Sequence, residues 1–392
     1  MRNVVIAGAS MTRFGKFADR RMKSLVGEAV DDALADAACP PDEVGMVHFG
    51  NVLGGLLQNQ ESSRGQIWLA ESALDGAAVV NVENACASGS TALHQAWLSV
   101  AAGLFDVAVA VGAEKMFDEE RRAGEALFSV VDQERLGPIT QELAAEGAQQ
   151  AIFMGIYARF ARDYAARTGA TAEDFARVAV KNHAHGARNP KAQYQHTFTV
   201  EEVLAARPIA GALTLPMCAP VSDGAAAIVV TTPDRAARWG TEAVSVLGIA
   251  LGGGRAGANG TVTGAAAQAF AMAGIRPDQV DVVECHDAAA PAELIALEEL
   301  GLCGPGEGPA LVRAGETSLG GRLPVNPSGG LESKGHPLGA TGPAQIVELC
   351  DQLRGRSGDR QVEGARIALA ENAGGYLGPD VASAVVTILA RT

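Results

Sequence analysis

Positive charge and aromatic side chains are both scarce in this sequence. Its 31 lysines and arginines face 45 aspartates and glutamates, which gives a formal net charge of −14. Nucleic acid and anionic membranes are therefore excluded as its main partners. Aromatic residues make up only 5% of the chain, whereas glycines number 47. This composition favours helices packed closely on sheets, and an anionic ligand would need helix N-termini or a local basic patch.

Paired cysteines and long apolar runs are also missing. None of the six cysteines lies in a Cys-x-x-Cys pair or at a spacing typical of a zinc site. Free thiols in a reducing compartment are the simplest interpretation. The chain begins directly with a β-like run, and no segment has the length and apolarity of a signal peptide or a transmembrane helix. We therefore expect a cytoplasmic protein with no membrane and no nucleic acid as partner.

Short β-like runs alternate with alanine-rich helical stretches along all 392 residues, 48% of which are hydrophobic. This alternation predicts an α/β fold of two or three packed units in which helices cover sheets. The expected strands are residues 2–9, 45–52, 106–113, 224–231, 243–248, 281–285, 366–370 and 382–389. The expected helices are residues 25–38, 88–103, 149–168, 172–184, 263–274, 292–300 and 341–353.

The two ends of the chain resemble each other. Residues 37–47 and 273–283 both pass from a helix end through Pro-Asp into a strand, and a Gly/Ser-rich turn, a helix and a strand follow in each half. Two similar stretches in the same order indicate the duplication of one unit. We expect one half at residues 1–114 plus 224–240 and the other at 241–392. Residues 115–223 would be an inserted loop domain, lying over the first half as a substrate-binding lid.

Cys86 is the leading candidate for a nucleophile. It stands just before the helix expected at residues 88–103, where the positive end of the helix dipole lowers the pKa of a thiol. Its own backbone N–H is placed to hold a developing oxyanion. On this local pattern alone, a buried cysteine that acts as a small apolar side chain is an equal alternative.

Two histidines occupy positions that the backbone sets. His336 follows a glycine and precedes a proline just before a predicted helix, so it is a candidate general base for a thiol. Alone, an exposed turn histidine would be the commoner case. His286 ends the strand expected at residues 281–285, where ligands bind in open sheets, and could hydrogen-bond a thioester oxygen. A histidine that caps the next helix is an equal alternative.

Three weaker candidates complete the set. Asn372 and Gly374 follow the strand expected at residues 366–370 and would supply a second oxyanion hole, or merely a tight turn. The basic cluster at residues 181–190 would meet anionic phosphates, although a solvated helix end is the commoner case. His183 and His185 within it have no metal-like partners nearby. We assign no metal site and no residues that bind a cofactor.

Together these motifs resemble the thiolase superfamily over essentially the whole chain. The His-Asp form of the middle motif is similar to the sterol-carrier-protein and archaeal branch. The blocks that carry the resemblance are Asn84-Ala85-Cys86-Ala87-Ser88-Gly89, His286-Asp287 with Glu293, and Asn326-Pro327-Ser328-Gly329-Gly330 running into Gly335-His336-Pro337-Leu338-Gly339-Ala340-Thr341-Gly342.

The resemblance implies the thiolase fold, in which two βαβαβαββ halves form five αβαβα layers, usually as a homodimer or a dimer of dimers. It implies an acyltransferase of lipid metabolism in which Cys86 takes the acyl group, His336 activates it and His286 binds the thioester oxygen. Coenzyme A thioesters would be substrates, with no permanently bound cofactor. Some relatives in this branch work with a small OB-fold, zinc-ribbon partner.

The sequence departs from the family at the second cysteine, which acts as acid and base on the α-carbon or on departing coenzyme A. Ala288 and Asn372 occupy its two usual places, and Cys285 would point to the opposite face of its strand. A positioned acid or base contributes about 10²–10⁴-fold in rate. Acylation of Cys86 needs only a nucleophile, a base and an oxyanion hole.

Three functions therefore stay open. The first is an acyl-CoA C-acyltransferase that makes or breaks a C–C bond of a 3-ketoacyl-CoA. The second is acyl transfer or thioester hydrolysis without efficient Claisen chemistry. The third is a subunit that binds coenzyme A thioesters within a complex.

Overall fold

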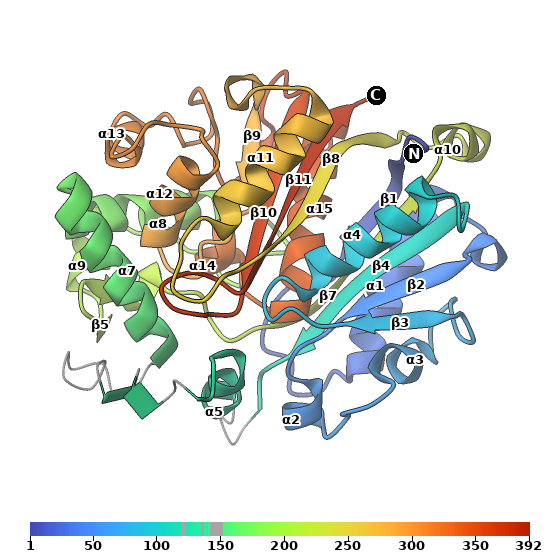
Figure 1. The fold of residues 1–392 in the computed structure, drawn as a ribbon, viewed down its shortest axis with the longest axis horizontal. Helices are drawn as coiled ribbons and strands as arrows, with labels where there is room; N and C mark the ends of the chain where they lie inside the picture. The colour runs from blue at the N-terminus through green and yellow to red at the C-terminus, as the bar shows by residue number, and fades with distance from the viewer. Residues whose placement is uncertain (119–122, 135–136, 139, 142–151) are drawn as a thin grey trace.

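The computed structural model describes residues 1–392 except 119–122, 135–136, 139 and 142–151. Within the described residues, nine strands form one mixed sheet in the order β3-β2-β4-β7-β1-β8-β11-β10-β9 (Figure 1). The strands are β1 Val5–Met11, β2 Met46–Gly50, β3 Val79–Val82, β4 Val107–Lys115, β7 Asp223–Thr231, β8 Val244–Gly253, β9 Val282–Glu284, β10 Ile367–Gly374 and β11 Ser383–Arg391.

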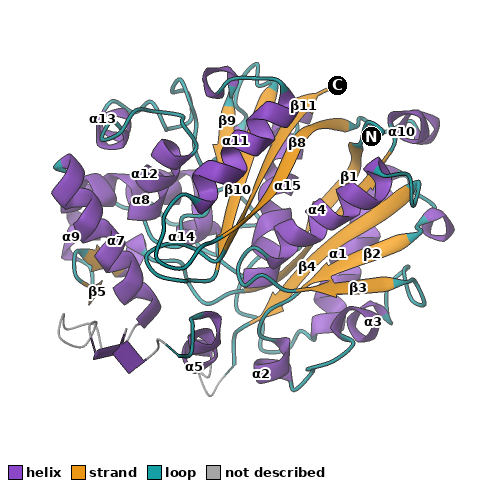
Figure 2. Ribbon diagram, viewed as in Figure 1, coloured by secondary structure: helices purple, strands orange, loops and turns teal. Residues whose placement is uncertain are grey.

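The sheet consists of two parts joined by a short seam. β1 and β8 pair through only two residue pairs, Val5 with Ser245 and Ile6 with Val244. The N-terminal part holds β1, β2, β3, β4 and β7, and the C-terminal part holds β8 to β11, as the two fans of strands in Figure 2 show. In each part the pairing is parallel toward the outer edge and antiparallel toward the seam.

Helices cover both parts of the sheet and also fill the space between them. Val5 and Ala7 of β1 point into a core with the outer helices, whereas Val4 and Ile6 point into the central core. The result is five layers, α-β-α-β-α, as predicted. The outer N-terminal layer is α1 Met22–Ala37 and α3 Arg64–Leu69, the central layer is α4 Ser88–Ala101 and α15 Leu338–Arg354, and the outer C-terminal layer is α11 Thr261–Ala273 and α12 Pro291–Glu299.

The duplication appears in matched local structure. α1 is followed by Ala38 in the left-handed region, then by a single 3-10 turn at Pro41–Glu43, and then by β2. α11 is followed by Gly274 in the left-handed region, a 3-10 turn at Pro277–Gln279, and β9. The shared Pro-Asp pattern therefore reflects one unit used twice.

The helices inserted between the halves are α7 Ile152–Thr168, α8 Ala172–Gly186 and α9 Val200–Ala205, with a small hairpin of β5 Pro208–Ala210 and β6 Leu213–Thr214. The expectation that this insertion lies over the first half is wrong for α7 and α8. α7 packs on α12, and α8 packs on α13 Gly308–Arg313 and α14 Gly330–Lys334 of the second half (Figure 1). The cause is a shared apolar core to which Phe175 and Leu294 both belong.

Three short helices, α2 Gly54–Gln58, α5 Ala123–Ala126 and α10 Pro233–Trp239, also lie in the described part of the chain, and α5 contacts α2 of the first half. Residues 149–151 of the expected helix 149–168 lie outside the described residues. Every helix in the described part of the chain is too short or too polar to cross a membrane.

One strand boundary differs from the prediction in a way that matters for the site. β10 continues past residue 370 to Gly374, which pairs with Ser383 of β11. Asn372 and Gly374 therefore lie inside the strand, and the turn begins at Gly375, whose φ is 68°. The polar pair Glu371 and Asn372 interrupts the apolar pattern of the strand, although both side chains are buried.

Candidate active site

Cys86 and His336 occupy equivalent places in the two halves, because each lies just before the central-layer helix of its half. Cys86 precedes α4 and His336 precedes α15. The two helices touch through backbone near their first turns. A Cβ atom on Gly89 of α4 would collide with the carbonyl oxygen of Gly339 on α15. This close approach brings the two side chains to the same point.

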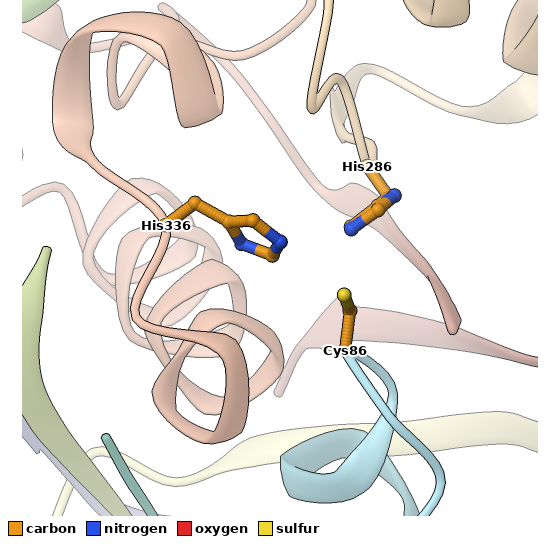
Figure 3. Close-up of side chains that lie close together, drawn as sticks. All are labelled: Cys86, His286 and His336. Atoms are coloured by element: carbon orange, nitrogen blue, oxygen red, sulfur yellow. The ribbon is translucent and has the colours of Figure 1, made fainter. Parts of the chain in front are cut away.

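Cys86, His286 and His336 form a buried cluster. Each contributes one donor atom, sulfur or ring nitrogen, and these three atoms lie within 4.8 Å of one another. The two imidazole rings are 5.0 Å apart at an angle of 71°. Figure 3 shows both rings directed toward the sulfur from separate segments of the chain. The structure thus brings together the three residues that the sequence analysis selected for catalysis.

The same cluster is also the place where a metal ion would be considered. Among the described residues, it is the one group of three cysteine, histidine or carboxylate side chains spaced closely enough to hold an ion. A thiolate with two imidazoles suits zinc or a similar soft cation. A cysteine nucleophile with a histidine base uses the same residue types, and we assign Cys86, His286 and His336 to catalysis and not to a metal site.

A tight turn presents Cys86. Ala85 has a φ of 48°, which is uncommon for a residue with a side chain. The N–H of Ala85 donates to Glu83 Oε1 at 2.6 Å, and the N–H of Ala87 donates to the carbonyl of Asn84 at 3.0 Å. These bonds fix the residues on either side of the nucleophile.

The expected lowering of the pKa of Cys86 is wrong. Burial, together with the charge of Glu114, raises the pKa of the thiol to about 12, against a smaller lowering by the backbone N–H of Cys86 itself. Desolvation of the thiolate outweighs the helix dipole here. Cys86 is therefore a thiol at neutral pH in the free protein, and it needs a base close by.

His336 is held in the tautomer that a base requires. Its Nδ1 lies 2.7 Å from Thr341 Oγ1, and that hydroxyl donates its single proton to the carbonyl of Pro337 at 3.0 Å. With the hydroxyl proton directed to Pro337, Nδ1 carries the ring proton and donates to Thr341, which leaves Nε2 unprotonated. Burial, then the charges of His286 and Lys334, hold the pKa of His336 well below its ordinary value. The imidazole is neutral and able to accept a proton.

His286 presents an unpaired ring nitrogen to the cluster. Its Nε2 is buried and makes no hydrogen bond within the described residues. Burial lowers the pKa of this histidine to about 4, so its ring is neutral. The backbone N–H of His286 donates to Glu371 Oε2 at 2.8 Å, which fixes the segment. A buried polar atom without a partner is costly, and a substrate oxygen would satisfy it.

A buried ionic network supports the His-Asp segment from behind. Asn182 Nδ2 donates to Asp287 Oδ2 at 2.9 Å, and Leu331 N–H donates to Asp287 Oδ1 at 2.8 Å. Lys181 lies 3.0 Å from Glu293 in an ion pair. The expectation of a solvated helix end at residues 181–190 is therefore wrong. The positive charge of Lys181 is paired with Glu293 inside the protein, and this ion pair stabilises the buried network behind the His-Asp segment.

The first place expected for a second cysteine contains no titratable group. Ala288 lines a small cavity of about 60 Å³ together with Cys86 and His336. Cys285 does not take over, because its sulfur points elsewhere and lies 3.5 Å from Asn326 Nδ2. As predicted, Cys285 and His286 point in opposite directions: the sulfur of Cys285 contacts Asn326, whereas the ring of His286 lies beside Cys86.

Asn372, at the second place expected for a cysteine, is not an acid or a base either. Ser90 Oγ donates to Asn372 Oδ1 at 2.9 Å, so this amide faces helix α4. Gly374 lies against the turn of Cys86, because a Cβ atom there would collide with the carbonyl of Asn84. Gly374 therefore borders the turn of the nucleophile and Asn372 the first turn of α4, and their role as oxyanion donors stays a prediction.

A larger cavity of about 450 Å³ opens beside His286, between α7, α12 and the β10–β11 turn. Such a volume suits a small-molecule ligand. Tyr157 lines both this cavity and the small cavity at Cys86. Three of the four tyrosines of the chain lie in its wall, although aromatic residues make up only 5% of the sequence. The lining includes Tyr157, Phe160, Tyr164, Tyr376, Glu299 and Glu371.

Glu371 is the residue that the sequence analysis missed. Its side chain is 2% exposed, and burial raises the pKa of its carboxyl group to about 7. The available signal was a glutamate directly after the apolar run from Ile367 to Ala370, where a charged residue needs a reason.

Comparison with known proteins gives the family. Residues 4–203 match the family described as thiolase, N-terminal domain, and residues 258–391 match the thiolase C-terminal domain-like family. An acetyl-CoA acetyltransferase of Methanothermobacter thermautotrophicus is 36% identical, with all of both chains covered. Sterol carrier protein 2 of Bos taurus is 35% identical over 95% of this chain and 70% of its own. The benzoylsuccinyl-CoA thiolase subunit BbsB of Thauera aromatica is 34% identical over 95% of each.

Solved structures agree with this assignment. The Ltp2-ChsH2(DUF35) aldolase superposes with a TM-score of 0.81 at 29% identity, covering 99% of this chain and 98% of its own. Human mitochondrial 3-ketoacyl-CoA thiolase in complex with CoA superposes with a TM-score of 0.72 at 18% identity, over 100% and 98% of the two chains, which shows the fold alone. The duplicated five-layer body, the Cys86 turn and the Gly-His-Pro segment therefore belong to a member of the thiolase superfamily.

Proposed function

We propose that this protein is an acyl-CoA C-acyltransferase that forms an acyl-enzyme on Cys86. The observation that carries the proposal is the buried cluster in which the sulfur of Cys86 and the ring nitrogens of His286 and His336 lie within 4.8 Å of one another. The cluster supplies a nucleophile, a neutral base and an unpaired hydrogen-bonding nitrogen, which are the parts that acyl transfer needs.

Each residue has one task in acylation. His336 Nε2 takes the proton of the Cys86 thiol as the sulfur attacks the thioester carbon. His286 Nε2–H and the backbone N–H of Cys86 donate to the oxygen that becomes negative. Coenzyme A leaves as a thiol after receiving the proton from His336. Asn372 and Gly374 would support this oxyanion site from β10, and residues 115–223 would close over the substrate as a lid, with Tyr157 between the two cavities.

A second candidate function is acyl transfer or thioester hydrolysis without efficient C–C chemistry. Ala288 and Asn372, at the usual places of the second cysteine, favour this alternative. The names of the relatives include both an acetyltransferase and an aldolase, so the same scaffold is compatible with different final steps.

Two kinds of partner are proposed. β3 is an edge strand whose Val80 is 43% exposed, and an open edge is suited to pairing with a second copy of the chain. A homodimer through this edge would bury it. The Ltp2 structure contains a DUF35 protein, which supports a small OB-fold, zinc-ribbon partner or a subunit role in a complex.

Intact-mass analysis tests the acyl-enzyme. Incubation with acetyl-CoA is expected to add one acetyl group to the wild-type chain and none to Cys86→Ala. Cys303→Ala is the matched control, because Cys303 is the most exposed of the six cysteines and would take non-specific acylation. The absence of an adduct with acetyl-CoA and with longer acyl-CoA thioesters would refute the proposal.

A second measurement separates the two candidate functions. A 3-ketoacyl-CoA with free coenzyme A is supplied, and the loss of the 3-keto thioester is followed. Thiolysis that requires Cys86 supports the acyltransferase. An adduct on Cys86 without cleavage or formation of a C–C bond supports the alternative.

A further inference from the structure

We propose that Glu371 is the group that removes and returns the α-carbon proton in the carbon–carbon step. The inference rests on the proposed acyltransferase function and identifies the acid and base of the same site. No described cysteine is placed to take this role, because Ala288 stands in the pocket of Cys86 and the sulfur of Cys285 contacts Asn326.

The position of Glu371 follows from β10. Glu371 and Ala373 line the large cavity, whereas Asn372 and Gly374 face the other way, toward α4 and the turn that presents Cys86. The carboxyl group accepts the backbone N–H of His286 at 2.8 Å, and the ring of that histidine faces the sulfur (Figure 3). Glu371 and His286 both line the cavity of about 450 Å³. An acyl-CoA bound there, with its thioester oxygen on His286, would place its α-carbon beside the carboxyl group.

Several other titratable groups that face this cavity are committed elsewhere, and Tyr157, which also lines the cavity at Cys86, keeps its proton because burial raises the pKa of its phenol. Asp380 accepts the N–H and hydroxyl of Thr261, and Glu298 accepts the hydroxyl of Tyr164. Arg167 pairs with Glu298 at 2.9 Å. Glu299, Asp163, Arg159 and Tyr157 also line the cavity, on α12 and α7. Glu371 is the carboxyl group that contacts the same residue as the reacting sulfur.

The electrostatic environment supports the role. Glu371 is fully enclosed by protein, and burial raises the pKa of its carboxyl group to about 7, against a lowering by the hydrogen bond from His286. A carboxylate with that pKa is a stronger base than an exposed one, and it changes protonation near neutral pH. The hydrogen bond from His286 uses Oε2 of Glu371, so lone pairs of the carboxylate remain that can accept a proton from a substrate.

The step balances as follows. The Glu371 carboxylate takes a proton from the α-carbon of the second acyl-CoA and becomes a carboxylic acid, and the thioester becomes an enolate. The enolate carbon attacks the carbonyl of the acyl group on Cys86, so that a C–C bond forms and the bond to Cys86 sulfur breaks. The proton on Glu371 then returns to the Cys86 thiolate. In the cleavage direction, Glu371 donates its proton to the enolate carbon.

The test compares Glu371→Gln with wild type in two separate assays. Intact mass after mixing with acetyl-CoA measures acylation of Cys86. Exchange of α-hydrogens of acetyl-CoA in deuterium oxide, together with thiolysis of a 3-ketoacyl-CoA, measures the carbon step. The glutamine keeps an oxygen for the His286 N–H. The matched control is Asp351→Asn, a half-buried carboxyl group on α15 that lines neither cavity and whose pKa burial likewise raises.

We expect Glu371→Gln to be acylated within threefold of the wild-type rate, while exchange and thiolysis fall by about 10²–10⁴-fold. The pH profile of the wild-type carbon step should bend near pH 7, and Asp351→Asn should keep both the rate and this bend. Wild-type carbon chemistry in Glu371→Gln would overturn the inference. An equal loss of acylation would also overturn it, since Glu371 would then merely position His286. A wild-type protein that forms no adduct would refute the proposed function instead.

Discussion

Replacement of Thr341 by valine tests how the tautomer of His336 is set. The Thr341 hydroxyl accepts from His336 Nδ1 at 2.7 Å and donates to the carbonyl of Pro337 at 3.0 Å. Valine has nearly the same shape but no hydroxyl, so the imidazole loses the acceptor that fixes its orientation. Thr341 is completely buried, and water would not readily replace the lost group.

The expected loss follows from the charge that develops on His336. In the proposed acylation the ring takes the thiol proton and becomes an imidazolium, whose Nδ1–H then makes a charge-assisted bond to Thr341. A hydrogen bond to a charged group contributes about 1.5–3 kcal/mol. At about 1.4 kcal/mol for each factor of ten, the acylation rate should fall by roughly 10- to 150-fold.

The assay is single-turnover acylation of Cys86, measured by quenched mixing with acetyl-CoA and intact mass. Thr341→Ser is the control, because it keeps the hydroxyl and should stay within a few fold of wild type. Thermal unfolding of both variants separates a local effect from general loss of structure. If Thr341→Val acylates as fast as Thr341→Ser, the hydroxyl does not hold His336 in its reactive tautomer.

Three further predictions concern the framework of the site. Burial raises the pKa of Glu371 in the folded protein to about 7, from an ordinary value of 4.5, so ionisation of this carboxyl group destabilises the fold as pH rises from 4.5 to 7. At about 1.4 kcal/mol per pKa unit, the free energy of unfolding of Glu371→Gln should exceed that of wild type by about 3 kcal/mol at pH 8. Denaturant unfolding should show this gain at pH 8 and not at pH 4. Gly89→Ala would put a methyl group against the carbonyl of Gly339 and should cost about 1–3 kcal/mol and slow acylation; an unchanged melting temperature would contradict the close contact of α4 and α15. Lys181→Met would leave Glu293 buried without its cation and should cost about 3–5 kcal/mol, part of which Lys181→Met with Glu293→Gln should restore.

Local pattern was sufficient for most of the layered body. The run of alanine, isoleucine and valine at residues 224–231 predicts a buried strand, and β7 is that strand. β3 escaped prediction because it has only four residues, of which Val80 and Asn81 are exposed. The amphipathic pattern of α8 indicates a buried face, but it does not identify the helix that covers this face. The packing of the insertion on the second half therefore required the structure.

The candidate site divides in the same way. Cys86 and His336 lie in local motifs that have few structural alternatives when they occur together, so the sequence was able to select them. The raised pKa of Cys86 arises from burial by distant segments and from Glu114, which no local pattern contains. Glu371 acquires its significance from His286, a residue 85 positions away. The sequence showed a missing cysteine but not the carboxyl group beside its place.

The geometry also explains how one scaffold accommodates different final reactions. The acylating pair, Cys86 and His336, depends on the contact between two central helices that the duplication makes equivalent. The proposed carbon step would depend on separate elements, the segment after β9 and the end of β10, which supply Ala288 and Glu371. Substitutions in the second set leave the helix contact intact, because they alter a cavity wall and not the central layer. The chemistry after acylation is therefore free to change while the nucleophile and its base stay fixed.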